Sequence, residues 1–213
     1  MAEFTYRMMF TFLALFPILN PPAMAPIFLQ LTSGLTDHER NRLATLIGLY
    51  TFALLATLLY VGGWALRLLG ISVPVISIAG GLLLFHSAWR MLNKNPKMSE
   101  SEKEEIQPEI LDRAFFPLTL PVTAGPGSMA VTLSLVPAGS LLEPPVLMQF
   151  LAMTCGIALA AAAVFVFYRF SPKVIQRLGR TGEATITQIA AFILLAIGVQ
   201  IVWNGLRALM KTL

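Results

Sequence analysis

Six apolar runs, each long enough to cross a lipid bilayer, constrain this chain more than any other feature. An α-helix needs about 20 predominantly apolar residues to span the hydrocarbon core of a membrane. With 12% charged residues and a mean hydropathy of +0.74, the chain has the composition of a membrane protein. We therefore expect an all-α membrane protein with six transmembrane helices. The runs lie around residues 8–32, 43–69, 73–92, 115–135, 146–169 and 184–209.

The distribution of Lys and Arg predicts how these spans are oriented. If successive connections alternate between the two sides, eleven of the 15 basic residues fall on one side and four on the other. The richer side is normally cytoplasmic, so we expect both termini outside the cytoplasm. Basic residues that are dispersed among span ends also argue against a nucleic-acid partner. The four are Arg7, Arg67, Arg207 and Lys211, and the eleven are Arg40, Arg42, Arg90, Lys94, Lys97, Lys103, Arg113, Arg169, Lys173, Arg177 and Arg180.

The chain contains an internal repeat. Residues 20–25 (NPPAMA) align with residues 125–130 (GPGSMA) at an offset of 105, and three of these six positions are identical. Residues 78–84 align with residues 189–195 at an offset of 111, with small residues over small ones. Each half then holds three spans, and an odd number makes the second half enter the membrane from the opposite face. Two inverted three-helix repeats are therefore expected.

This repeat sets the expected domain organisation. Residues 1–92 form the first repeat, residues 93–113 a cytoplasmic linker, and residues 114–213 the second repeat. The linker mixes acidic and basic residues and is too short to fold as a soluble domain. We expect a single membrane domain overall.

Prolines interrupt the first and fourth spans at corresponding places. Proline has no N–H, so the first helix is predicted to break at Asn20-Pro21 and the fourth at Gly125-Pro126. Each break frees backbone carbonyls and starts a half-helix whose N–H groups favour an anion, with Asn20 as a good N-cap. Broken helices in corresponding positions of two repeats are typical of transporter sites. The alternative is that these prolines only kink two helices so that they pack.

A cavity between two such breaks suits a zwitterion, whose carboxylate meets a half-helix N-terminus while its ammonium meets the freed carbonyls. None of the eleven acidic residues lies inside a predicted span, which argues against a carboxylate proton relay. The expected substrate-binding residues are Asn20, Pro21, Pro22, Thr123, Ala124, Gly125, Pro126, Gly127, Ser128, Gln200 and Asn204.

The remaining polar residues of the spans each allow two interpretations. Thr119, Thr123 and Ser128 supply hydroxyl ligands to substrate or sodium, or they bond within their own helix. Gln200 and Asn204 share a helix face and line the path, or they bond to a neighbouring helix. His86 couples transport to protons, or it is a neutral imidazole bonded between helices.

Catalysis is not expected. The chain has no phosphate-binding loop, zinc-ligand spacing or nucleophile motif, so neither a cofactor nor a metal site is predicted. The single Cys155 excludes an internal disulfide and is most simply a packing residue.

An ordered set of motifs resembles the MarC family of six-span bacterial and archaeal membrane proteins, which includes SnatA-type transporters of small neutral amino acids. The resemblance covers nearly the full chain, although Ala191 replaces a common glycine and Pro22 stands where relatives vary. The motifs are Asn20-Pro21 with residues 26–29 (PIFL), residues 39–42 (ERNR), residues 78–81 (IAGG), residues 117–121 (PLTLP), residues 124–127 (AGPG), residues 198–200 (GVQ) and Asn204-Gly205.

The resemblance implies two inverted repeats with substrate held at the broken helices, and glycine, alanine or similar solutes as cargo. We therefore expect a secondary transporter that moves small neutral amino acids across the inner membrane by alternating access. Coupling to sodium or to protons stays open. The alternatives are a non-transporting membrane scaffold, and a channel or exporter of another small polar solute.

Overall fold

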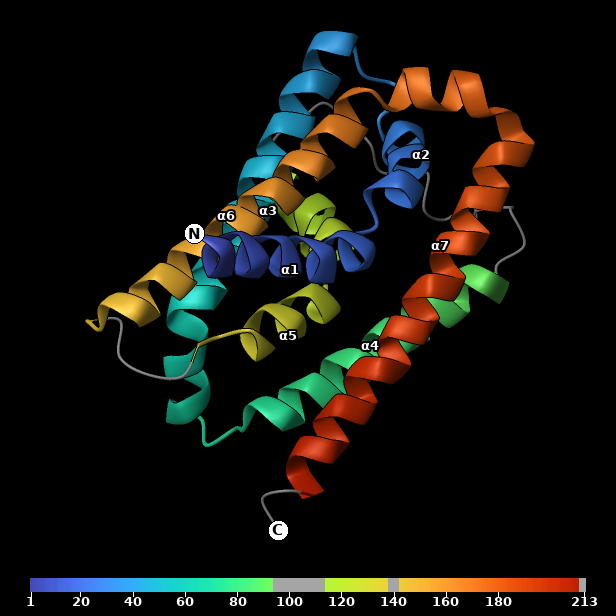
Figure 1. Ribbon diagram of the computed structural model, residues 1–213. Coiled ribbons are helices and arrows are strands. Elements are labelled where there is room, and N and C mark those ends of the chain that lie inside the picture. The colour runs from blue at the N-terminus through green and yellow to red at the C-terminus, as the bar shows by residue number, and fades with distance from the viewer. Residues whose placement is uncertain (94–113, 138–141, 211–213) are drawn as a thin grey trace.

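The computed structural model describes residues 1–93, 114–137 and 142–210, and these residues form helices and no strand (Figure 1). Apart from Asn93, the predicted linker of residues 93–113 lies outside the described residues. The helices are α1 (Ala2–Leu19), α2 (Pro21–Leu31), α3 (Asp37–Leu68), α4 (Val73–Asn93), η2 (Ala114–Thr123), α5 (Pro126–Ser134), α6 (Pro144–Arg169) and α7 (Ser171–Met210).

Five helical segments of the described residues are long and apolar enough to cross a membrane, against the six that we expected. They are Ala2–Leu29, Asp37–Leu66, Val73–Asn93, Pro144–Arg169 and Gln188–Met210. The predicted fourth span instead consists of two short helices, η2 and α5, separated by Ala124 and Gly125. Neither piece reaches the length of a span, because Pro117, Pro121 and Pro126 interrupt the ladder of backbone hydrogen bonds.

The α6 helix lies at the centre of the core. Ile157, Ala160 and Val164 are fully buried on it, and it packs against α1, α2 and α3. Gly156 allows α1 to approach closely, because a Cβ atom there would lie 2.6 Å from the carbonyl oxygen of Met8. This contact holds α1 across α6, as Figure 1 shows.

Several helix–helix contacts come in corresponding pairs, one from each half of the chain. The α3 helix packs against α6, and α4 packs against α7. The α2 helix contacts α7 and α6, just as α5 contacts α4 and α3, and α1 contacts α6 as η2 contacts α3. Each of these contacts has a counterpart in the other half, whereas the smaller contacts of α1 with α5 and α7 and of α6 with α7 have no counterpart of similar extent.

Glycines bring α4 and α7 into close antiparallel contact. A Cβ atom on Gly81 would lie 2.9 Å from the carbonyl oxygen of Gly198, and one on Gly205 would lie 2.9 Å from that of Pro74. Residue numbers therefore rise along α7 as they fall along α4. Backbone atoms leave no room for side chains at these points, so this pairing depends on small residues.

The turn between α2 and α3 is closed by side chains. Thr36 and Glu39 form a capping box, in which the Thr36 N–H and hydroxyl donate to the Glu39 carboxylate at 2.9 and 2.7 Å. The guanidinium of Arg40, which is 9% exposed, donates to the carbonyls of Thr32 and Leu35. These bonds satisfy backbone acceptors at the end of α2 that no helical N–H reaches.

We expect Gly198→Ala to destabilise the protein by about 1–3 kcal/mol, since overpacking forces backbones apart. The added Cβ would meet the Phe85 backbone nitrogen at 2.8 Å and the Gly81 carbonyl oxygen at 3.0 Å. Thermal unfolding in detergent measures the effect. Gly34→Ala is the control, because nothing lies within 4 Å of a Cβ there. Equal stability of the two variants would contradict the close α4–α7 contact.

Candidate functional site

The first break consists of one residue. The α1 helix ends at Leu19 and α2 begins at Pro21, while Asn20 adopts the left-handed conformation with φ 47° and ψ 53°. Its N–H donates to the Phe16 carbonyl at 2.9 Å, and its carbonyl accepts the Met24 N–H at 3.0 Å. Asparagine tolerates this conformation better than most residues. Asn20 therefore closes α1 as well as opening α2, so its backbone is not in the extended conformation of an ordinary N-cap.

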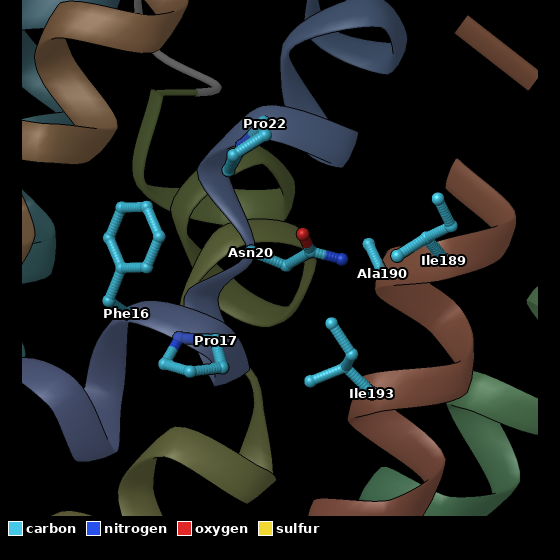
Figure 2. Close-up of a pocket in the computed structure, with 7 residues that line it drawn as sticks. All are labelled: Phe16, Pro17, Asn20, Pro22, Ile189, Ala190 and Ile193. Atoms are coloured by element: carbon cyan, nitrogen blue, oxygen red, sulfur yellow. The ribbon is translucent and has the colours of Figure 1, made fainter. Parts of the chain in front are cut away.

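A cavity of about 280 Å³ lies between this break and α7 (Figure 2). Three of its lining residues, Ile189, Ala190 and Ile193, come from α7, and the sequence analysis did not single them out. A signal was nevertheless present, because all three belong to the stretch of residues 189–195 that repeats residues 78–84. The other lining residues are Phe16, Pro17, Asn20 and Pro22.

Asn20 supplies the one polar side chain among these lining residues. The side chain points towards Ala190 and Ile193 in Figure 2, and the residue is only 5% exposed. Its Nδ2 atom is buried without a hydrogen-bond partner among the described residues. An unsatisfied buried donor costs about 1–3 kcal/mol.

The same break offers few backbone donors. The expected anion site relied on free N–H groups in the first turn of α2, but Pro21 and Pro22 occupy its first two positions and have none. The Asn20 amide is thus the main donor at this point. The two prolines also cannot donate to the carbonyls of Pro17 and Ile18.

The second break is present as predicted, and the η2 segment that precedes it is irregular. The η2 helix has wide π-type turns and non-helical backbone angles at Phe116 and Leu120. Gly125 is extended, with φ −81° and ψ 179°, and Pro126 begins α5. A Cβ atom on Gly125 would lie 3.0 Å from the Pro121 carbonyl oxygen, so the turn leaves little space there.

The hydroxyl groups near the second break bond to their own segment. Thr119, Thr123 and Ser128 are each at most 3% exposed. They donate to the carbonyls of Ala114, Leu118 and Gly125 at 2.7, 2.7 and 2.8 Å. The structure therefore has these hydroxyls bonded within their own segment, which was the second of the two interpretations.

Tyr168 joins the two breaks and was not foreseen. Its hydroxyl lies 2.9 Å from the Thr123 hydroxyl at the end of η2, and its ring stacks on Phe28 of α2 with the centroids 4.5 Å apart. The crevice beside these residues has no room for a water molecule. A buried tyrosine normally finds a partner for its hydroxyl. The position of Tyr168 inside an apolar span was therefore the signal in the sequence that its hydroxyl bonds to another segment.

The two breaks do not share the cavity. No residue of the second break lines it, and Ala124 and Gly127 are buried elsewhere, with Gly127 against the side chain of Leu84. Pro21 is buried in α2, whereas Pro126 is exposed. The structure therefore joins the Asn20 side of the predicted site to α7 rather than to the Gly125 side.

The other predicted polar residues lie on the outside of the chain. Gln200 donates from Nε2 to Oδ1 of Asn204 at 2.9 Å, and both residues are exposed on α7. His86 is exposed on α4 and forms no hydrogen bond with the described residues. None of these three residues lines the cavity.

Comparison with known proteins places the whole chain beside one group of membrane proteins. A family profile described as "MarC family integral membrane protein" matches residues 5–210. The membrane protein YvbG of Bacillus subtilis is 31% identical over 95% of each chain. A membrane protein of Aquifex aeolicus is 33% identical, over 99% of this chain and 97% of its own, and the inner membrane protein MarC of Escherichia coli is 32% identical over 93% of each. No solved structure matches the chain.

We expect Tyr168→Phe to lower stability by about 1 kcal/mol, the usual net contribution of one hydrogen bond. The ring stacking on Phe28 is retained, so the loss isolates the hydroxyl contact with Thr123. Thermal unfolding in detergent measures it. Tyr6→Phe is the matched control, because Tyr6 is 68% exposed near the start of α1. A stability loss in Tyr6→Phe that equals that of Tyr168→Phe would contradict the assignment.

Proposed function

The chain belongs to the MarC family of integral membrane proteins, and from this premise we propose that it is a secondary transporter of small neutral amino acids. It moves them across the inner membrane by alternating access, as the SnatA-type transporters that its motifs resemble do. The observation that carries the proposal is the buried, unpaired amide of Asn20 at the cavity beside the first break.

Chemistry at this cavity fits a solute that is zwitterionic and small. The Asn20 Nδ2 donates to the substrate carboxylate, and the carbonyl of Pro17, which also lines the cavity, accepts from its ammonium. The lining residues carry no charge, which favours a solute without net charge. A volume of about 280 Å³ lies just below the range that is usual for drug-sized ligands, about 300–1,000 Å³, as expected for a smaller solute. The apolar walls provided by Ile189 and Ile193 suit an apolar side chain.

The packing pattern supports two inverted repeats and six crossings. Exchanging α1 and α2 with η2 and α5, α3 with α6, and α4 with α7 preserves the larger helix contacts, although not the smaller ones of α1 with α5 and α7 and of α6 with α7. Because α4 and α7 are antiparallel and exchange with one another, the two-fold axis is perpendicular to both, as it is in inverted repeats. In this proposal η2 and α5 together form the sixth crossing, just as α1 and α2 form the first.

The two halves also differ in the way that alternating access requires. The cavity beside the first break has a volume of about 280 Å³, whereas the crevice that Phe28, Thr123 and Tyr168 line has no room for a water molecule. In carriers built from inverted repeats, one repeat rocks against the other around a fixed site. We assign the closed crevice to the shut side of the carrier. The Tyr168 contacts that join the breaks keep it shut.

The proposed membrane and the orientation of the chain in it rest on the relatives and on the distribution of basic residues. MarC of Escherichia coli is named an inner membrane protein, and we propose the same location for this chain. Both termini lie outside the cytoplasm, because eleven of the 15 basic residues belong to the other side. No enzymatic step is part of this proposal.

In reconstituted vesicles, labelled alanine or glycine exchanges against unlabelled solute. Counterflow is the appropriate assay because glycine has only five heavy atoms, and at about 1.5 kcal/mol per atom its affinity is micromolar at best. Failure across a panel of small zwitterions would favour the scaffold alternative. Exchange of a different polar solute would favour the exporter. Runs with and without sodium and pH gradients identify the coupling ion.

Asn20→Asp is the sharpest test of the site. Aspartate has nearly the same shape and tolerates the left-handed conformation, but it replaces the donor with a group that repels a carboxylate. Loss of a hydrogen bond to a charged group is worth about 1.5–3 kcal/mol, so we expect alanine exchange to weaken roughly 10- to 150-fold.

Asn20→Gly is the matched control for the backbone, since it keeps the left-handed turn and removes only the amide. It folds as the wild type does and loses exchange to a similar extent. Normal exchange by both purified variants would move the site elsewhere.

A further inference from the structure

The outer face of α7 carries two amide side chains. Gln200 and Asn204 are exposed and bond to each other at 2.9 Å, one helical turn apart. Beside them on the exposed surface of α7 lies a large apolar side chain, Trp203, which is 55% exposed. A polar pair in such surroundings needs a physical explanation.

These amides lie at the depth of the hydrocarbon. The membrane span of α7 is Gln188–Met210, so its midpoint is residue 199 and Gln200 is next to it. Asn204 lies about 6 Å further along the helix, at 1.5 Å per residue. Arg207 follows one turn later, close to the end of the span, where its charge reaches water.

The pair leaves polar atoms without partners. Each amide has two N–H donors and one carbonyl acceptor, and the single bond between them uses one donor of Gln200 and the acceptor of Asn204. The Gln200 Oε1 and the Asn204 Nδ2 form no hydrogen bond with other described residues. In hydrocarbon each such group costs several kcal/mol, so lipid is a poor neighbour for this face.

The chain itself covers α7 less than its other spans. Only 22% of the most apolar window of this span is buried, against 28–50% in the other four. The α4 helix covers one side of α7, and α2 covers part of another. The face that carries Gln200 and Asn204 is therefore available to a partner within the membrane.

We propose that this face is the interface between two copies of the chain. Copies inserted in the same orientation are related by a two-fold axis along the membrane normal, so identical residues meet at identical depth. Gln200 then faces Gln200 of the other copy, and Asn204 faces Asn204. An amide is both donor and acceptor and can pair with itself, which supplies the missing bonds on both sides at once.

A second copy is the occupant that best matches these observations. It necessarily presents a complementary amide at this depth, whereas another membrane protein would need one by coincidence. Trp203 supplies apolar contact beside the amides, since hydrogen bonds between membrane helices contribute only about 0.6–2 kcal/mol each. Gln200, Trp203 and Asn204 do not line the cavity, so the interface can be tested separately from transport.

Cysteine crosslinking in native membranes tests the interface. In a Cys155→Ala background, which removes the single native thiol, Asn204→Cys is oxidised with copper phenanthroline. We expect a disulfide-linked dimer at twice the chain mass. Leu49→Cys is the control, because Leu49 is 57% exposed near the middle of the α3 span and is not on α7. Equal crosslinking at both positions, or crosslinking of Asn204→Cys only to another protein, overturns the proposal.

A second measurement removes the amides. For the Gln200→Leu/Asn204→Leu variant, single-molecule photobleaching in vesicles counts the copies in each complex over a range of protein-to-lipid ratios. We expect its dimer to dissociate at least tenfold more readily than the wild type. The Tyr60→Phe/Thr154→Val variant is the control, because it removes a polar pair bonded at 3.0 Å between α3 and α6 of one copy. A monomeric wild type, or a dimer that the leucines leave unchanged, overturns the proposal.

Discussion

Backbone groups in hydrocarbon must find partners, and the arrangement of this protein depends on that constraint. The two breaks meet it differently. At the first, the left-handed Asn20 donates its N–H to a carbonyl of α1 and accepts an N–H of α2 with its own carbonyl, so a single residue interrupts the helix. At the second, the hydroxyls of Thr119 and Thr123 bond to carbonyls of the wide η2 turns. The irregular backbone is thereby tolerated at both places, provided that protein surrounds it.

Close helix packing supplies those surroundings. Gly156 admits the backbone of α1, Gly127 admits the side chain of Leu84, and Gly80 lies against Ala130. Tyr168 then joins α6 to both broken segments, through its hydroxyl at Thr123 and its ring at Phe28. The contact at Tyr168 fills its crevice while the Asn20 side retains a cavity, so the first break borders a cavity and the end of η2 is packed closely.

The α7 helix connects this cavity with the outer surface. Near the start of its span it contributes Ile189, Ala190 and Ile193 to the cavity wall, and further along it exposes Gln200 and Asn204. The helix is continuous from Ser171 to Met210. Any movement of α7 that widens the cavity therefore also moves the face that we assign to a second copy. Transport and association would then act on the same helix.

The sequence alone determined the membrane class, the helical composition and the positions of both breaks, because these depend on local chemistry: the length of apolar runs and the missing N–H of proline. It also placed Gln200 and Asn204 on one helix face, which follows from helical periodicity. Periodicity cannot tell which of several apolar faces meets which neighbour. Only the tertiary structure decided that Asn20 faces Ala190 and Ile193 rather than the second break, since residues about 170 positions apart meet through packing. The same holds for the Tyr168 contacts and for the exposure of the amides, which depend on how closely the glycines allow whole helices to approach.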